Sequence, residues 1–314
     1  MRCGPDLFFH LSSDYCRESL SLYLNQIPAM KKELTIIMGP TGVGKTDYSI
    51  ALAKAYGSPV INCDSRQIFR EMRIGTAPPS AEQLREVKHY FIFSHSVREY
   101  YTAGRYEMEA LAILEELFKE HDRLIMAGGS GMYIDALCNG LDDFPEADQQ
   151  LRSSLMLRLR QEGLESLKKQ LEAIDKASYD TLDVSNPQRV VRALEVTLQT
   201  GRKFSDWKSS PKKQRPFLIR KTGLTRDRGE LYDRINQRVD LMMEAGLLEE
   251  VRALQEYRDR PALKTVGYKE LFDYLDGRTT LETAVELIKR NSRRYAKRQL
   301  TYWGRDREIE WLKL

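Results

Sequence analysis

The sequence predicts an α/β fold in which a parallel sheet is flanked by helices and interrupted by an all-helical insertion. Two observations predict it. Short apolar runs alternate with helical segments along most of the chain, as in sheets whose strands are buried on both faces. Between residues 141 and 201 this alternation stops, and leucines recur only at helical spacing.

Each predicted element depends on a local pattern. A short apolar run indicates a buried strand, and an apolar face that recurs every three to four residues indicates an amphipathic helix. The predicted strands are Leu34–Met38, Pro59–Cys63, Leu124–Ala127 and Phe217–Leu224. The predicted helices beside them are Lys45–Tyr56, Leu231–Leu254 and Leu281–Tyr302. The apolar positions of the insertion are Leu151, Leu155, Leu159, Leu164, Leu167, Leu171 and Ile174.

Composition excludes several classes of protein. With 41% hydrophobic and 31% charged residues, the chain has the balance of a soluble globular protein. No stretch approaches about 18 uninterrupted apolar residues, so no membrane partner is expected. The four cysteines fit neither a zinc site nor a disulfide framework, which predicts reduced thiols in a cytoplasmic protein. We expect a monomer.

One motif carries specific chemistry. Gly39-Pro40-Thr41-Gly42-Val43-Gly44-Lys45-Thr46 matches GxxxxGK[ST], the P-loop, and lies between a predicted strand and a predicted helix. Glycines let backbone N–H groups turn toward one anion, and the helix N-terminus adds a favourable dipole. Lys45 supplies a point charge for phosphate oxygens, and Thr46 can bind Mg²⁺. The motif therefore predicts a binder of a di- or triphosphate.

With this motif the chain divides into three parts. Residues 30–140 and 202–314 are predicted to form a P-loop NTPase-like core, and residues 141–201 a helical insertion. Met30 stands just before the point where a compact domain would begin. Residues 1–29 are therefore predicted to be a dispensable N-terminal extension.

Asp64, directly after the second predicted strand, has two interpretations. It could be a Walker-type metal ligand or a helix N-cap. Alternatively, it is a general base at the carboxyl edge of the sheet, where α/β proteins bind their ligands. The NKxD base reader of GTPases is absent, and the strand at Leu124–Ala127 runs into a glycine-rich turn without a carboxylate. The residues alone leave both interpretations open.

Seven motifs in order carry a resemblance to a known family. They are GPTGVGKT at Gly39–Thr46, DSRQIFREMRIGTAPPS at Asp64–Ser80, GGSGMY at Gly128–Tyr133, NPQRVVRALEV at Asn186–Val196, DRGELYDRINQRVD at Asp227–Asp240, TVGYKEL at Thr265–Leu271 and RRYAKRQLTYW at Arg293–Trp303. From about Leu34 onward the chain thereby resembles the tRNA dimethylallyltransferases. It departs from the family pattern at four places, namely Phe69 (usually Tyr), Pro78 (usually Lys), His89–Phe91 (usually HHL) and Ser130 (usually Thr).

The resemblance implies a reaction. A dimethylallyl group would pass from dimethylallyl diphosphate to N6 of the adenosine 3′-adjacent to the anticodon, at tRNA position 37. Asp64 matches the family's catalytic base, which is needed because an exocyclic adenine amine is a poor nucleophile. The P-loop would hold the departing diphosphate, with Mg²⁺ at Thr46. Arg228 matches an arginine that helps to hold the diphosphate or the aspartate, so the implied catalytic residues are Asp64, Thr46 and Arg228.

The resemblance also implies a tRNA interface. An adenine in an anticodon loop must be flipped out to reach a buried channel. The implied contact residues are Asp64, Ser65, Arg66, Gln67, Ser130, Arg152, Gln188, Arg189, Val190, Val191 and Arg192. The insertion would clamp the anticodon stem-loop, and the basic stretch over residues 289–307, interleaved with aromatic residues, suits phosphate contact and stacking. No Cys₂His₂ spacing occurs, so the compact bacterial type is the closer match.

Three other functions share part of this pattern. An adenylate isopentenyltransferase would use the P-loop and Asp64 but would not need the insertion or the basic C-terminal stretch. The P-loop alone would favour a nucleoside or nucleotide kinase. A non-catalytic, nucleotide-dependent RNA-binding switch belongs to a different class and would bind RNA without transferring a group.

Overall fold

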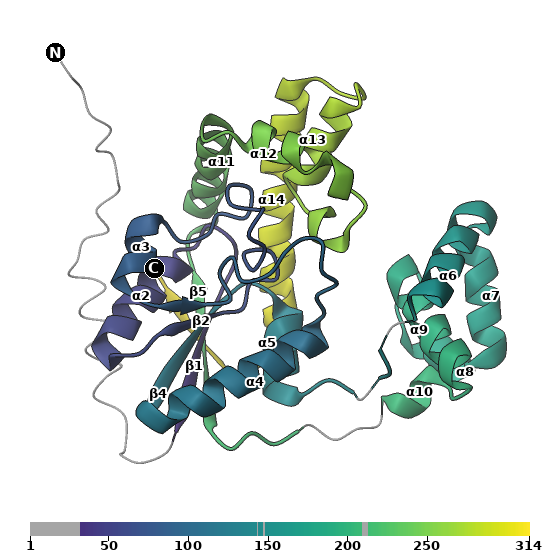
Figure 1. The fold of residues 1–314 in the computed structure, drawn as a ribbon, viewed down its shortest axis with the longest axis horizontal. Coiled ribbons are helices and arrows are strands. Elements are labelled where there is room, and N and C mark those ends of the chain that lie inside the picture. Colours follow the sequence, from purple (N-terminus) through teal and green to yellow (C-terminus); the bar gives the residue numbers. More distant parts are fainter. Residues whose placement is uncertain (1–31, 143, 147, 209–212) are drawn as a thin grey trace. The chain divides into compact units, whose positions relative to one another are not determined.

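The computed structural model describes residues 32–142, 144–146, 148–208 and 213–314 (Figure 1). The described residues form two compact units, one made of residues 32–138 together with Arg215–Leu314, the other of the described residues within Asn139–Gln214. The predicted extension, residues 1–29, lies outside the described residues. Within the described part, no helix is both long and apolar enough to cross a bilayer.

The first unit is built on one parallel sheet, which confirms the predicted fold class. Its strands are β1 Glu33–Met38, β2 Val60–Asn62, β3 His89–Tyr90, β4 Arg123–Gly128, β5 Leu218–Thr225 and β6 Ile309–Lys313. They lie in the order β3-β2-β4-β1-β5-β6, and every neighbouring pair is parallel. Strands β3 and β6 were not predicted, because β3 has only two residues and β6 is mostly exposed.

The central strands are buried on both faces. Consecutive residues Ile36 and Ile37 of β1 are both fully buried, although they point to opposite sides of the sheet. Helix α2 (Lys45–Tyr56) contributes Leu52 to the same core, and helix α11 (Arg228–Glu244) contributes Ile235. This two-sided burial explains why the strand signal in the sequence was continuous rather than alternating.

The other helices of this unit are α3 Ala81–Glu86, α4 Ala103–Glu120, α5 Gly131–Asn139, α12 Leu247–Ala253, α13 Tyr268–Leu275 and α14 Leu281–Trp303. Helices α11–α14 form one group (Figure 1). The single helix predicted over Leu231–Leu254 is wrong, since α11 ends at Glu244 and α12 begins at Leu247. Gly246 causes the break, because its φ of 96° is a left-handed conformation that an α-helix cannot contain.

Among the described residues of the second unit, all regular structure is helical. Its helices are α6 Gln149–Glu162, α7 Leu164–Ile174, α8 Lys176–Thr181, α9 Pro187–Thr200 and α10 Phe204–Trp207. Leu155, Leu167 and Leu171 form its core together with residues of α9. The predicted boundary at 201/202 is corrected to Gln214, because Phe204 is buried in this core and stacks on Phe144 at 4.7 Å.

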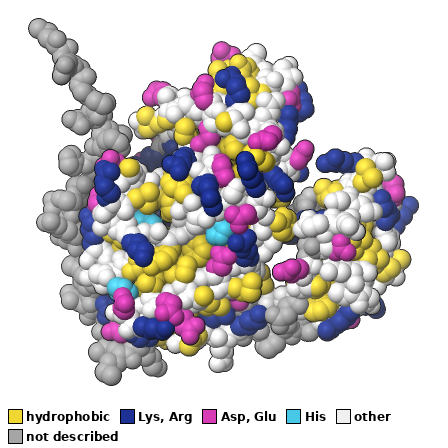
Figure 2. All heavy atoms as spheres, viewed as in Figure 1, with side chains coloured by type: hydrophobic (Ala, Val, Ile, Leu, Met, Phe, Trp, Pro, Cys, Tyr) yellow, Lys and Arg dark blue, Asp and Glu magenta, His cyan; other side chains and the backbone are white. Residues whose placement is uncertain are grey.

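Surface charge is mixed. On the face drawn in Figure 2, Lys and Arg side chains are interspersed with Asp and Glu and with apolar areas. This agrees with a net charge of only +4. On this face, affinity for a polyanion must therefore come from local arrangements of basic residues.

Candidate active site

Three turns meet at the carboxyl edge of the sheet. The register pairs Met38 of β1 with Gly128 of β4, and Asn62 of β2 with Ala127 of β4. The P-loop, the DSRQ segment and the GGSG turn therefore begin side by side, at the edge where α/β proteins bind ligands. Residues of the P-loop, the DSRQ segment, α11 and α14 line a cavity of about 850 Å³ there.

The P-loop takes its shape from its glycines. Gly39, Gly42 and Gly44 have φ values of 153°, 84° and 112°, which favour glycine. A Cβ atom on Gly39 would lie 2.7 Å from the carbonyl oxygen of Leu224, so close approach also excludes other residues. Gly44 caps the N-terminus of α2, which directs the helix dipole at the cavity.

Lys45 and Thr46 both line the cavity. The Lys45 ammonium donates to the carbonyl oxygens of Gly39 (2.8 Å) and Pro40 (2.9 Å). Its burial lowers the pKa to about 8, although the negative charge of Asp64 opposes this shift. A lysine with so depressed a pKa gains strongly from a phosphate partner, because the anion restores the charged form.

The eight residues of the motif play different parts. Thr41, Gly42, Gly44, Lys45 and Thr46 line the cavity. Val43 is fully buried in the core of the sheet. Gly39 and Pro40 supply the carbonyl groups that hold Lys45. Gly39, Pro40 and Val43 thus support the loop, and their predicted contact with a phosphate stays a prediction.

Asp64 lines the same cavity as Lys45 and Thr46. Its Oδ1 accepts hydrogen bonds from the backbone N–H groups of Arg66 (2.8 Å) and Gln67 (3.4 Å), and these bonds fix the carboxyl group. The location agrees with the predicted base at the carboxyl edge of the sheet. Its chemical role stays a prediction at this point.

The neighbours of Asp64 mostly hold the loops in place. Ser130 Oγ accepts from Ser65 N (2.8 Å) and donates to Ser65 Oγ (3.0 Å). The Ser130 hydroxyl group, one of the implied tRNA contacts, therefore joins the GGSG turn to the DSRQ segment. Ser65 and Arg66 line the cavity, whereas Ser130 is not one of the described residues that do so.

The segment after Asp64 contains two of the departures from the family pattern, Phe69 and Pro78. Gln67 Nε2 donates to the carbonyl oxygens of Thr76 (3.1 Å) and Ala77 (2.9 Å), so both amide hydrogens support the turn that carries Pro78. Gln67 and Pro78 line the cavity. Phe69 is buried, with only 4% of its surface exposed, so the phenyl ring serves the core at this position.

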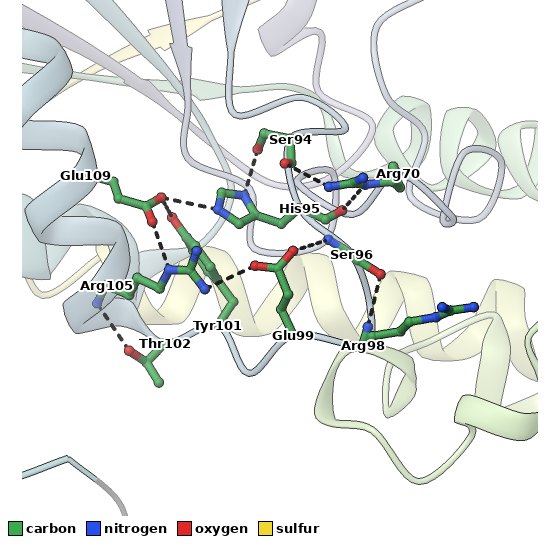
Figure 3. A network of polar contacts seen from close by, with 10 residues as sticks. All are labelled: Arg70, Ser94, His95, Ser96, Arg98, Glu99, Tyr101, Thr102, Arg105 and Glu109. Carbon is green, nitrogen blue, oxygen red and sulfur yellow. Dashed lines mark hydrogen bonds and ion pairs between the residues drawn. The ribbon is translucent and has the colours of Figure 1, made fainter.

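A polar network ties this segment to α4 (Figure 3). The backbone carbonyl oxygen of His95 accepts a hydrogen bond from Arg70 N (2.9 Å). The His95 side chain places Nε2 3.3 Å from Glu109 Oε2 on α4. Glu109 also accepts from Tyr101 OH (2.7 Å) and Arg105 Nε (2.8 Å). One carboxylate thus fixes the loop beside the segment that follows Asp64.

The predicted Arg228 does not line the cavity. It is exposed, and its guanidinium lies over the Tyr232 ring at 5.2 Å. Sequence reasoning missed two arginines further along α11 that do line the cavity. Arg234 Nε donates to Gly42 O (2.9 Å), and Arg238 Nη1 donates to Thr41 Oγ1 (3.3 Å). Burial lowers the pKa of both guanidinium groups.

The basic C-terminal stretch divides into two sets. Arg294 and Arg298 of α14 line the cavity beside Tyr295. Lys289 is instead paired with Asp240 at 2.7 Å. Some basic residues of this stretch therefore lie at the site, whereas Lys289 forms an ion pair with another helix of the unit.

In the helical unit, the predicted tRNA residues are of three kinds. Arg152 and Arg192 form ion pairs at 2.8 Å and 2.9 Å with the two oxygens of Glu195, which is fully buried. Gln188 lies at the start of α9 and is exposed, as is Arg189, which is 3.4 Å from Asp183. The prediction for Val190 and Val191 is wrong, because both are fully buried in the core of this unit.

Comparison with known proteins places this site in a family. A family model described as IPP transferase matches residues 67–306. Among curated relatives, tRNA dimethylallyltransferase 1 of Bacteroides thetaiotaomicron is 49% identical over 278 residues, covering 88% of this chain and 90% of that protein. tRNA dimethylallyltransferase 1 of Porphyromonas gingivalis is 50% identical over 278 residues, covering 88% and 93%.

Solved structures agree with the sequence matches. The tRNA isopentenylpyrophosphate transferase of Bacillus halodurans has a TM-score of 0.66 at 37% identity and covers 90% of each chain. A eukaryotic dimethylallyltransferase described as acting on tRNA has a TM-score of 0.76 at 26% identity, covering 90% of this chain and 74% of that one. The chain therefore belongs to the IPP transferase family, in which its curated relatives are tRNA dimethylallyltransferases.

Proposed function

We propose that this protein transfers a dimethylallyl group from dimethylallyl diphosphate to N6 of the adenosine at tRNA position 37, giving N6-(dimethylallyl)adenosine and diphosphate. The observation that carries the proposal is that Asp64 lines the same cavity as Lys45 and Thr46. One cavity therefore offers a cradle for a leaving diphosphate and a carboxylate for an attacking amine. The tRNA dimethylallyltransferases that match the chain support this combination.

The diphosphate end of the donor would lie in the P-loop. Backbone N–H groups at the start of α2 and the Lys45 ammonium would stabilise the charge that gathers on the leaving oxygen. Arg234 and Arg238 of α11 add two guanidinium groups, which are bonded to Gly42 O and Thr41 Oγ1 of the P-loop. When the C–O bond breaks, its electron pair stays with the diphosphate, and these cations stabilise the resulting negative charge.

The donor's hydrocarbon would need an apolar surface. Val239, Met242 and Val266 line the cavity together with the charged groups. A five-carbon allyl group packed against these side chains loses its contact with water. This favours binding and protects the electron-poor carbon from hydrolysis.

Asp64 would act as the general base. The lone pair of an exocyclic adenine amine is delocalised into the ring, so the nitrogen becomes nucleophilic as its proton leaves. As the new C–N bond forms at the allylic carbon, that proton would pass to the Asp64 carboxylate. The hydrogen bonds from Arg66 and Gln67 to Oδ1 hold the carboxyl group in place for this transfer.

A magnesium ion fits the donor set on the P-loop side. Mg²⁺ usually takes one or two protein oxygens and fills its other positions with substrate phosphates and water. Thr46 lines the cavity at the first turn of α2 and would supply that oxygen. When bound, the ion adds positive charge against the leaving diphosphate.

The tRNA would be held by basic residues in both units. Those that line the cavity are Arg66, Lys264, Lys269, Arg294 and Arg298. In the helical unit, Arg152, Gln188, Arg189 and Arg192 are the polar members of the predicted contact set. We propose that a monomer carries out the reaction, in the cytoplasm.

A direct test uses labelled dimethylallyl diphosphate, Mg²⁺ and undermodified tRNA. We expect label in the tRNA, and none when position 37 carries guanosine. Transfer to AMP in place of tRNA would overturn the proposal in favour of an adenylate isopentenyltransferase. Phosphate transfer from ATP, without prenyl transfer, would overturn it in favour of a kinase.

A further inference from the structure

We propose that Gln299 is a positioning residue that fixes the diphosphate cradle and Asp64 at one separation. This inference rests on the function proposed above. Gln299 lies on α14, far along the chain from both groups, and is buried, with 6% of its surface exposed. It lines the cavity without belonging to either turn.

The Gln299 amide joins two of the three turns of the site. Its Oε1 accepts a hydrogen bond from the backbone N–H of Thr41 in the P-loop at 2.9 Å. Its Nε2 donates to the carbonyl oxygen of Gly129, in the turn after β4, at 2.9 Å. Only a side chain that ends in both an acceptor and a donor can satisfy these two backbone groups together.

The turn that Gln299 holds passes directly beside the base. A Cβ atom on Gly129 would lie 2.6 Å from Gln299 Nε2 and 3.8 Å from Asp64 Oδ2. A larger residue at this position would displace the Gln299 amide. The next residue, Ser130, is bonded through its hydroxyl group to Ser65, which follows Asp64.

These bonds form a continuous path. It runs from Thr41 through Gln299 to Gly129, and then through Ser130 to the DSRQ segment that carries Asp64. The reaction needs the amine, the allylic carbon and the leaving oxygen in line, and a misplacement of about 1 Å can cost about 100-fold in rate. Gln299 therefore sets the geometry of the reaction without touching the reacting atoms.

Gln299→Met tests the proposal, because methionine has a similar volume and neither hydrogen bond. We expect turnover to fall about 10- to 100-fold. The KM for each substrate, inhibition by inorganic diphosphate and tRNA affinity should stay within about threefold, because each half of the site keeps its own shape. Gln237→Met is the matched control, since Gln237 is exposed on α11, and its turnover should stay normal.

The same substitution in an Asp64→Asn background separates this inference from the function itself. If Gln299 acts by placing the base, Gln299→Met should slow Asp64→Asn much less than it slows the native protein. A slowing by the same factor in both backgrounds would overturn the inference and leave the function standing. An Asp64→Asn variant with native turnover would instead overturn the proposed function.

A purely structural role predicts a different pattern. Diphosphate inhibition would then weaken in step with turnover, because the P-loop itself would have lost its shape, and this result would also reject the proposal. If Gln299→Met does not fold, Gln299→Glu gives the same measurement. Glutamate keeps the acceptor for Thr41 N and loses the donor to Gly129 O, so the same loss of turnover is expected.

Discussion

Replacing Asp64 by asparagine removes one charge from the cavity and little else. Oδ1 of the amide can still accept from Arg66 N and Gln67 N, which lie 2.8 Å and 3.4 Å from the carboxylate oxygen. The loop should therefore keep its shape. What disappears is the proton acceptor, and general-base catalysis is typically worth about 10²- to 10⁴-fold. That range corresponds to about 3–5 kcal/mol of activation free energy.

Loss of the Asp64 charge also changes the pKa of Lys45. The Asp64 charge raises the pKa of Lys45 against the burial that lowers it to about 8. Without that charge the Lys45 pKa falls further, and more of the lysine loses its proton near neutral pH. Measuring at about pH 6 as well as about pH 8 separates the two effects, since the loss at the lower pH reflects the base alone.

The assay is single-turnover transfer of labelled dimethylallyl at saturating donor and tRNA. Asp64→Asn should lose about 10²- to 10⁴-fold in rate with tRNA affinity within about threefold. Asp47→Asn is the control, because Asp47 also lines the cavity but is bonded to Gln83 Nε2 at 2.8 Å. A rate for Asp64→Asn within tenfold of the native protein, or an equal loss for Asp47→Asn, would refute the reasoning.

Three further predictions follow from the geometry. The Lys45 ammonium is charged below its pKa of about 8, so inhibition by inorganic diphosphate should be full below that pH and weaken above it; a flat profile from pH 7 to about 9.5 would contradict this. Arg238→Gln should raise the KM for the donor about tenfold or more, because a charge-assisted hydrogen bond is lost, whereas Arg228→Gln should leave this KM unchanged. Steady-state kinetics in which Arg228→Gln raises the KM and Arg238→Gln does not would reject the assignment. Glu195→Gln should destabilise the helical unit by about 3–5 kcal/mol, because it leaves two arginines beside a neutral buried amide; calorimetry showing an unchanged transition would rule this out.

The parts of the site that are local in sequence were predictable. The P-loop is one continuous segment whose strand, glycines and helix follow each other directly, so its motif fixes its geometry. Asp64 was predictable for the same reason, since a carboxylate directly after a buried strand must lie at the carboxyl edge of the sheet.

The choice of arginine on α11 failed because it relied on motif position rather than helical phase. Leu231, Ile235 and Val239 mark the buried face of this helix, and their four-residue spacing was readable in the sequence. Arg234 and Arg238 each precede one of these residues by one position and so border the buried face. The same reasoning would have assigned Val190 and Val191 to the core of the helical unit.

Other features depend on contacts between distant segments. The bond between Thr41 and Gln299 joins residues 258 positions apart, and no periodicity in the chain indicates it. The extent of the helical unit likewise became visible only through the stacking of Phe204 on Phe144. Such features require the tertiary fold because their sequence signals are single residues of ordinary type.

The buried Glu195 carboxylate lowers the net positive charge that the helical unit presents to a polyanion. Arg152 and Arg192 share Glu195, so the three groups together carry about one unit of positive charge rather than two. An arriving phosphate releases counterions in proportion to the charge it meets. The affinity for tRNA should consequently depend less steeply on salt concentration than the number of arginines suggests. These two arginines would contribute to tRNA binding through their fixed positions more than through their net charge.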